Sequence, residues 1–109
     1  MDLTATAFYC QTPEANINEI VAQEKELKKY LNAAGGWKAD SYVDNGGSWP
    51  DGEQTAYAQL EQAIERGRVH RVVVLSQQQL GRNEKEALQR AKWMRDRDVE
   101  LILLHNRPW

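Results

Sequence analysis

The residues that could carry chemistry in this sequence gather where an apolar segment enters a polar loop. Val72–Leu75 is an apolar, β-branched run, the next residues include three glutamines, and Arg82 and Asn83 stand where a helix is expected to begin. Open α/β sheets place their chemistry at such junctions, at the carboxyl ends of the strands. An arginine binds anions there, and exposed amide hydrogens at the helix start near Asn83 favour negative charge. The pattern therefore places the candidate site at this junction, and anion binding is one hypothesis for it; the other interpretation of Arg82 is a surface residue beside the helix.

The histidines and the cysteine lack the neighbouring residues that a metal site or a catalytic site would need. His70 and His105 have neither metal-ligand spacing nor acidic company, so we expect no metal. The sequence contains no Walker loop and no GxGxxG pattern, so no motif supports a nucleotide, and we expect no cofactor. Cys10 is the single cysteine, which excludes an intrachain disulfide, suits a reducing compartment and is typical of a small buried hydrophobic residue.

The elements that must position these residues alternate between strand and helix patterns. Runs of β-branched, aromatic and aliphatic residues predict strands at Thr4–Cys10, Trp37–Val43, Arg71–Leu75 and Val99–Leu104. Helical spacing of apolar residues predicts helices from Asn16 to Gly35, from Glu53 to Arg66, and onward from Asn83. Composition predicts loops at Asp44–Gly52 and Gln77–Gln79.

Caps and apolar faces support the helix assignments. Asn16 with Glu19, and Asn83 with Glu86, resemble capping boxes. The predicted buried face of the first helix carries Ile20, Leu27 and Leu31, with Val21 and Tyr30 beside them. The apolar residues of the last helix are Ala87, Leu88, Ala91 and Met94.

The alternation of strands and helices predicts the fold class. Strands separated by helices imply right-handed βαβ crossovers and a mostly parallel sheet. We predict a single α/β domain over residues 1–109, a three-layer arrangement with a central, mostly parallel four-stranded sheet flanked by helices. Val72–Leu75 is apolar without alternation, so we expect it to be central and buried on both faces.

The net charge and the hydropathy of the sequence limit which classes of partner we expect. The formal net charge of −2 argues against a chain-wide electrostatic grip on nucleic acid, and the basic residues after Leu60 mostly alternate with acids. We therefore expect DNA contacts to be weak or indirect. No apolar run approaches a membrane span and no N-terminal signal is visible, so we expect no membrane contact and a cytoplasmic location.

Blocks of the sequence resemble the N-terminal catalytic domain of serine recombinases, the resolvase/invertase family. That family reads, in outline, Tyr-x-Arg-x-Ser after strand one, a helix Gln, Asp-x-Gly-x-Ser-Gly after strand two, Arg-Pro-x-Leu entering a helix, and Asp-Arg-Leu-x-Arg after a valine-rich strand. The corresponding segments here are Tyr9–Pro13, Gln23, Asp44–Trp49, Tyr57–Leu60 and Gln78–Arg82. The match spans nearly the whole chain, from the first predicted strand to the last. The resemblance implies a resolvase-like fold.

The departures from the family pattern fall on its chemistry. In the family a serine hydroxyl attacks a DNA phosphodiester, and arginines stabilise the charge on the phosphate oxygens. The nucleophile position holds Pro13 here; Thr12 is one residue away, and a one-residue slip along a strand end points to the other face. The family-aligned catalytic positions are Gln11, Thr12, Pro13, Tyr57, Gln78, Gln79 and Arg82. Of the arginines only Arg82 is retained, and we expect these side chains to face a solvent-accessible cleft.

These observations predict a resolvase-like domain that is catalytically inactive and acts as an interaction or regulatory module linked to DNA recombination or a mobile element. Its partner would be another protein or a second copy of the chain. The alternative is a divergent, active DNA strand-exchange domain that uses Thr12 with Arg82 and is separated from its DNA-binding part. A third hypothesis is an α/β domain that binds a small anion near Asn83. The enzyme hypothesis gains if Thr12 points into the cleft between the ends of strands one and three, and loses if Pro13 lies there.

Overall fold

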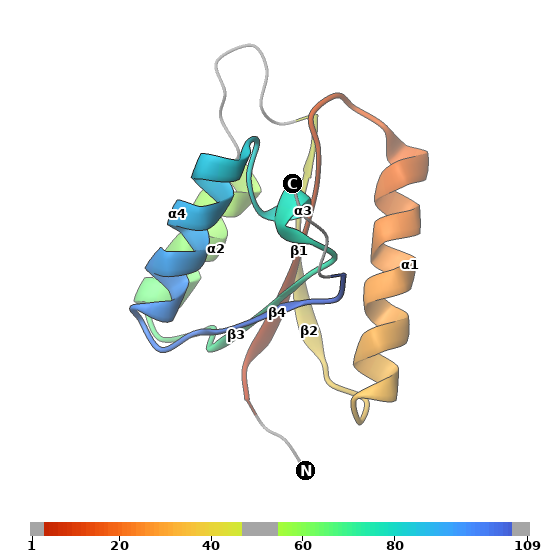
Figure 1. Cartoon of the computed structure of the whole chain (residues 1–109). Coiled ribbons are helices and arrows are strands. Elements are labelled where there is room, and N and C mark those ends of the chain that lie inside the picture. Colours follow the sequence, from red (N-terminus) through yellow and green to blue (C-terminus); the bar gives the residue numbers. More distant parts are fainter. Residues whose placement is uncertain (1–3, 47–54, 106–109) are drawn as a thin grey trace.

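The chain folds into one parallel sheet that lies between helices, as the alternating pattern predicted (Figure 1). The structure is a computed structural model and describes residues 4–46 and 55–105. In these ranges the sheet has the order β2-β1-β3-β4, and every neighbouring pair of strands is parallel. The strands are β1 (Thr6–Thr12), β2 (Ala39–Asn45), β3 (Arg71–Val74) and β4 (Glu100–Leu103). The helices are α1 (Ile17–Ala33), α2 (Thr55–Glu65), α3 (Gln77–Leu80) and α4 (Glu84–Arg95).

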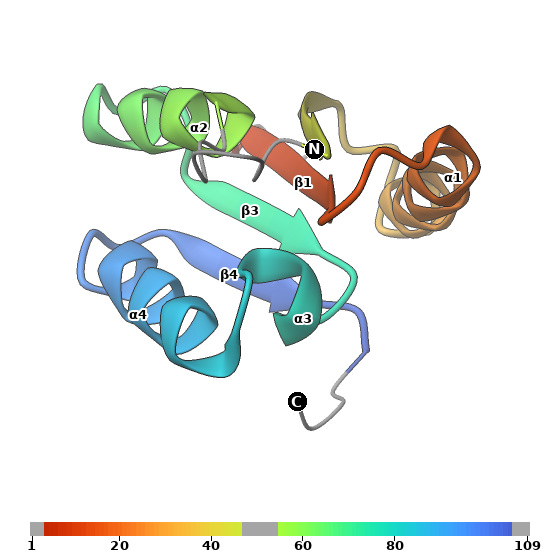
Figure 2. The same cartoon turned by 90° about the horizontal axis from the view of Figure 1, so that it is seen from above.

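Helices cover both faces of the sheet and create two cores (Figure 2). Successive residues of a strand point to opposite faces, so Tyr9 packs with α2 and α4 whereas Phe8 and Cys10 pack with α1. All seven residues of β1 and all four of β3 are buried. Burial on both faces explains why Val72–Val74 is apolar without alternation, and it confirms the predicted central position of this segment.

Both predicted helix caps form, although each makes only half of a capping box. The Asn16 side chain accepts a hydrogen bond from the Glu19 amide at 3.1 Å, and Asn83 accepts one from the Glu86 amide at 2.9 Å. The Glu86 carboxylate binds the amide of Arg82 rather than that of Asn83. The prediction of the buried face of α1 was wrong at Val21, which is 56% exposed because it lies outside the stripe that meets the sheet. Leu88 of α4 is likewise 50% exposed.

Several element bounds differ from the predictions. Pairing with β1 runs from Thr6 opposite Ala39 to Thr12 opposite Asn45, so both strands start and end about two residues later than composition indicates. Residues 77–80 form the short helix α3 instead of a loop, because the fully buried Leu80 draws the segment onto the core. The predicted loop residues Ser48 and Trp49, and the predicted helix start at Glu53, lie outside the described residues.

Candidate functional site

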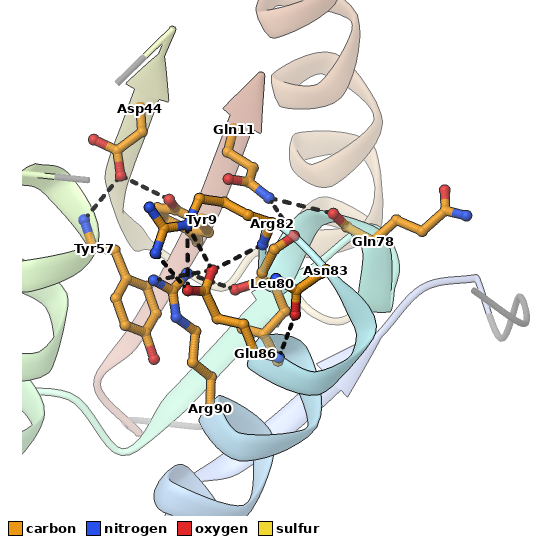
Figure 3. Close-up of polar contacts among 11 residues, drawn as sticks. Tyr9, Gln11, Asp44, Tyr57, Gln78, Leu80, Arg82, Asn83, Glu86 and Arg90 are labelled. Carbon is orange, nitrogen blue, oxygen red and sulfur yellow. Dashed lines mark hydrogen bonds and ion pairs between the residues drawn. The ribbon is translucent and has the colours of Figure 1, made fainter. Parts of the chain in front are cut away.

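The candidate site lies where β1 and β3 end and α4 begins, and α3 bridges this region (Figure 3). The side chain of Gln11, at the end of β1, donates from Nε2 to the carbonyl oxygens of Gly81 at 2.8 Å and Gln78 at 3.3 Å. Gln23 from α1 holds the Gln11 backbone, accepting from its amide at 3.3 Å and donating to its carbonyl at 3.0 Å. Gln11 is therefore buried and connects β1 to α3 and to the turn after it through neutral hydrogen bonds.

Thr12 lies on the opposite face of the sheet from Gln11. Alternation along β1 places it with Phe8 and Cys10 on the α1 side, where it is 2% exposed. Its hydroxyl donates to Oδ1 of Asn45 at 3.0 Å, and that oxygen also accepts from the Asn16 amide at 2.6 Å. The hydroxyl thus helps to hold β1, β2 and the start of α1 together, and it points away from the side of the sheet that carries Gln11.

Pro13 is exposed and lies next to the start of α1. Together with Thr12, Ala15, Asn16 and other residues it lines a hollow on that side of the molecule. The Thr12 hydroxyl bonds to Asn45 at this junction rather than to the charged groups at the start of α4.

Asp44 is a buried carboxylate that connects β2, β1 and α2. It accepts hydrogen bonds from the Tyr9 hydroxyl at 2.6 Å and from the amides of Ala56 at 2.9 Å and Tyr57 at 3.0 Å. Burial, followed by the bond to Asp44, raises the pKa of Tyr9 above its ordinary range. The carboxylate caps the start of α2 and meets the positive end of that helix. The composition of the predicted loop did not reveal that Asp44 caps a helix. The available signal was its position as an acidic residue shortly before a predicted helix.

Tyr57 is buried where the family resemblance places an arginine. Its ring meets Tyr9 edge-on at 5.4 Å, and the guanidinium carbon of Arg90 lies 3.7 Å from its ring centroid. Its hydroxyl has no hydrogen-bond partner in the described part of the chain, and burial raises the pKa of this group. A guanidinium from α4 therefore lies over the Tyr57 ring. Arg90 was not among the predicted site residues.

Arg82 is exposed and forms an ion pair with Glu86. Its Nη2 lies 2.7 Å from Oε2 of Glu86, its Nε lies 3.1 and 3.2 Å from the two carboxylate oxygens, and its backbone amide donates to Oε1 at 2.8 Å. Arg90 reaches the same Oε1 from Nη2 at 3.4 Å and donates from Nη1 to the Leu80 carbonyl at 2.9 Å. The hydrogen bond to Arg82 lowers the pKa of Glu86, so its carboxylate is ionised at neutral pH. Arg82, Glu86 and Arg90 are spaced four residues apart, which places their side chains side by side on a helix. Our sequence analysis did not use this signal.

The predicted site residues thus divide into two groups. Gln11, Tyr57, the turn after α3 and Arg82 lie on the side of α2 and α4, whereas Thr12 and Pro13 lie toward α1. Exposure also divides them and corrects the expectation that all face solvent. Gln11, Thr12 and Tyr57 are buried and Gln79 is half-buried, while Pro13, Gln78 and Arg82 are exposed.

Other reactive groups do not join this site. Cys10 is fully buried, and burial raises the pKa of its thiol to about 12. Within residues 4–46 and 55–105 no group of three or more His, Cys, Asp or Glu side chains could hold a metal ion. In the same ranges no helix has the length and apolarity that crossing a membrane requires.

The fold and these segments define a resolvase-type domain, and the comparisons agree. The chain belongs to the family described as "Resolvase, N terminal domain", which matches residues 7–108. Among solved structures it is similar to the N-terminal catalytic domain of TP901-1 integrase, with 28% identity and a TM-score of 0.80 over 93% of this chain and 78% of that chain. A comparison with curated proteins gives no match.

Two more distant structures share the fold. The C-terminal catalytic domain of ISC1926 TnpA, an IS607-like serine recombinase, has 15% identity and a TM-score of 0.75 over 94% of this chain and 71% of that chain. The first ORF in transposon ISC1904 from Sulfolobus solfataricus P2 has 16% identity and a TM-score of 0.74 over 96% of this chain and 70% of that chain.

Proposed function

We propose that this chain is a resolvase-like domain that does not cleave DNA and acts as an interaction or regulatory module in DNA recombination. The observation that carries the proposal is the position of the Thr12 hydroxyl. It is 2% exposed, donates to Asn45, and lies on the face of the sheet away from Gln11. A nucleophile for phosphoryl transfer must approach the phosphorus in line with the leaving oxygen, close to the groups that stabilise the charge. Thr12 does not meet that requirement, and Pro13 has no hydroxyl.

A shortage of positive charge for binding a phosphate group also supports the proposal. Gln11 donates to two backbone carbonyls, so its amide is already used, and a neutral amide lacks the charge and fork geometry of an arginine. Loss of one preorganised donor costs roughly 3–4 kcal/mol of transition-state stabilisation. Tyr57 and Gln79 are further neutral residues at family arginine positions, so the deficit includes several such donors.

The similar proteins point to a biological setting. TP901-1 integrase and the transposon ISC1904 protein belong to DNA-mobilising systems by their descriptions, which favours a role linked to a mobile element. In that role the partner is a recombinase-type protein or a second copy of this chain, the location is the cytoplasm, and direct DNA contacts are weak.

A covalent-adduct assay tests the proposal. The protein is mixed with radiolabelled supercoiled and nicked DNA and separated on denaturing gels beside an active serine recombinase on its own site. We expect no protein–DNA band from the wild type, because the aligned nucleophile is absent. Thr12→Ala serves as the matched variant. A protease-sensitive shifted band that disappears in Thr12→Ala would establish the alternative, an active strand-exchange domain that uses Thr12.

A further inference from the structure

We propose that the outer edge of β2 is a docking site for an extended, acidic peptide segment of a partner protein. The segment adds a strand to the sheet and places its carboxylates beside Arg66 and Arg68. The inference rests on the proposed function, because it names the surface through which an interaction module would bind another protein.

β2 is an edge strand, and its outward backbone groups are unpaired within residues 4–46 and 55–105. β1 pairs with it on one side, and no strand of these ranges lies on the other. The Gly46 amide donates to the Thr12 carbonyl of β1, and alternate residues of a parallel strand bond to the same neighbour. The even-numbered residues of β2 therefore bond to β1, whereas Ala39, Ser41 and Val43 direct their N–H and C=O groups outward. Such an open row of donors and acceptors is a template for another strand.

A groove of about 330 Å³ lies on the side of β2 that α2 covers. Tyr42 of β2 and Gln59 and Gln62 of α2 contribute to its lining. The tyrosine is half-buried and both glutamines are exposed, and in the described part of the chain their side chains make no hydrogen bond. Because side chains alternate along a strand, every second residue of an added strand would face this groove and its uncommitted polar groups.

Arg66 and Arg68 also line the groove and make its charge positive. Their amides donate to the carbonyls of Gln62 at 3.0 Å and Ala63 at 2.8 Å, so the backbone that carries them is fixed to the end of α2. Both side chains are exposed, and neither forms an ion pair or a hydrogen bond with any described residue. Asp40 is the acidic residue among the described residues that line the groove. Two guanidinium groups against one carboxylate favour an acidic segment over a basic one.

Hydrogen exchange followed by NMR tests whether a ligand pairs with this edge. The probe is a short peptide in which glutamates alternate with valines, and the control peptide has lysines in place of the glutamates. At saturation we expect the glutamate peptide to slow exchange of the outward Ser41 and Val43 amides by about tenfold or more. The Tyr42 amide, which already bonds to β1, should not change. The lysine peptide should bind about tenfold more weakly.

Two matched pairs of variants test the backbone and the charges separately. Ser41→Pro removes an outward N–H, which an edge strand tolerates, and should weaken binding about tenfold, whereas Ser41→Ala should bind like the wild type. The double variant Arg66→Gln/Arg68→Gln should weaken binding about tenfold at low salt. Its control is Lys25→Gln/Lys29→Gln, which removes the same charge from exposed positions of α1 and should leave binding unchanged. If Ser41→Pro does not melt cooperatively, the arginine and lysine double variants decide.

Equal affinities of the arginine and lysine double variants would overturn the inference, as would unchanged exchange at the outward amides of β2. Slower exchange at those amides when the protein alone is concentrated would assign the edge to a second copy of the chain, which also overturns it. None of these outcomes depends on DNA cleavage. A covalent adduct with DNA would contradict the proposed function, whereas a peptide that fails to bind removes only this partner surface.

Discussion

A single buried carboxylate, Asp44, joins three elements on the side of the sheet that carries the arginines. It receives the Tyr9 hydroxyl from β1 and two amides from the start of α2. Both Tyr9 and Asp44 are almost completely buried, so each of these groups has given up its water on folding. Hydrogen bonds to a carboxylate make a modest net contribution to stability, and removing one partner also leaves the other buried and unsatisfied.

We therefore expect Asp44→Ala to lower the free energy of unfolding by about 3 kcal/mol, through loss of a helix cap and an orphaned tyrosine hydroxyl. Urea denaturation followed by circular dichroism measures the change. Asp44→Asn is the matched control: it keeps an acceptor and should lose less. In the double variant Tyr9→Phe/Asp44→Ala the two losses should fall short of their sum, because the hydroxyl is no longer orphaned. Full additivity would contradict the coupling.

At the scale of elements, close backbone approaches bring the strand ends to their helices. The amide of Gly46, just after β2, donates to the Thr12 carbonyl at 3.0 Å, and this turn packs against the β1–α1 connection. Gly46 has a φ of +76°, and a Cβ there would lie 2.6 Å from the Ala15 nitrogen. Gly81 meets α4 in the same way, since its Cβ would lie 2.6 Å from the Ala87 nitrogen. These approaches help place Thr12 against Asn45 and Arg82 at the start of α4.

Gly46→Ala should destabilise the protein by about 2 kcal/mol or more, because it combines left-handed backbone strain with a clash against backbone atoms. The comparison is Gly36→Ala, where φ is +74° and nothing lies within 4 Å of the added Cβ. That variant should cost only the backbone term of about 1–2 kcal/mol. Chemical denaturation of both proteins measures the difference. Equal losses would mean that the turn moves away from Ala15 at no cost.

At the scale of the whole molecule, the two cores bury acidic protons that titrate only at high pH. Burial is the largest cause of the raised pKa of Tyr9, Cys10 and Tyr57, and it takes the Cys10 value to about 12. In the unfolded chain a thiol titrates near 8.5 and a tyrosine near 10. The folded protein therefore holds these protons to higher pH than the unfolded chain does. Their contribution to stability is complete below the unfolded pKa values and is lost as the pH rises.

Thermal melts should accordingly show the melting temperature falling from about pH 8.5 upward, and more steeply beyond about pH 10. Cys10→Ala should flatten the first part of this fall. Tyr57→Phe should flatten the second part, at little cost at neutral pH, because in the described part of the chain its hydroxyl has no hydrogen-bond partner. A melting temperature that stays constant between pH 8 and 11 would contradict the expected linkage.

Much of the molecule was determined by local patterns in the sequence. Period and composition predicted the strands, the main helices and the parallel sheet, because backbone hydrogen bonding and one-sided burial impose those repeats. The caps at Asn16 and Asn83 followed from residue type. The sequence alone also contained the spacing of Arg82, Glu86 and Arg90, since pairs four apart meet on one helix face.

Tertiary structure alone decided which side chains meet across elements. The register of β1 against β2 turned Thr12 toward Asn45, and a shift of one residue would have reversed its face. The packing of α4 beside α2 brought Arg90 over Tyr57, although the two residues belong to different segments of the chain. The bonds of Gln11 to the turn after α3 likewise depend on how that turn folds over the sheet. Such contacts depend on the angles and distances between elements, which are set by the packing of whole cores rather than by any local repeat.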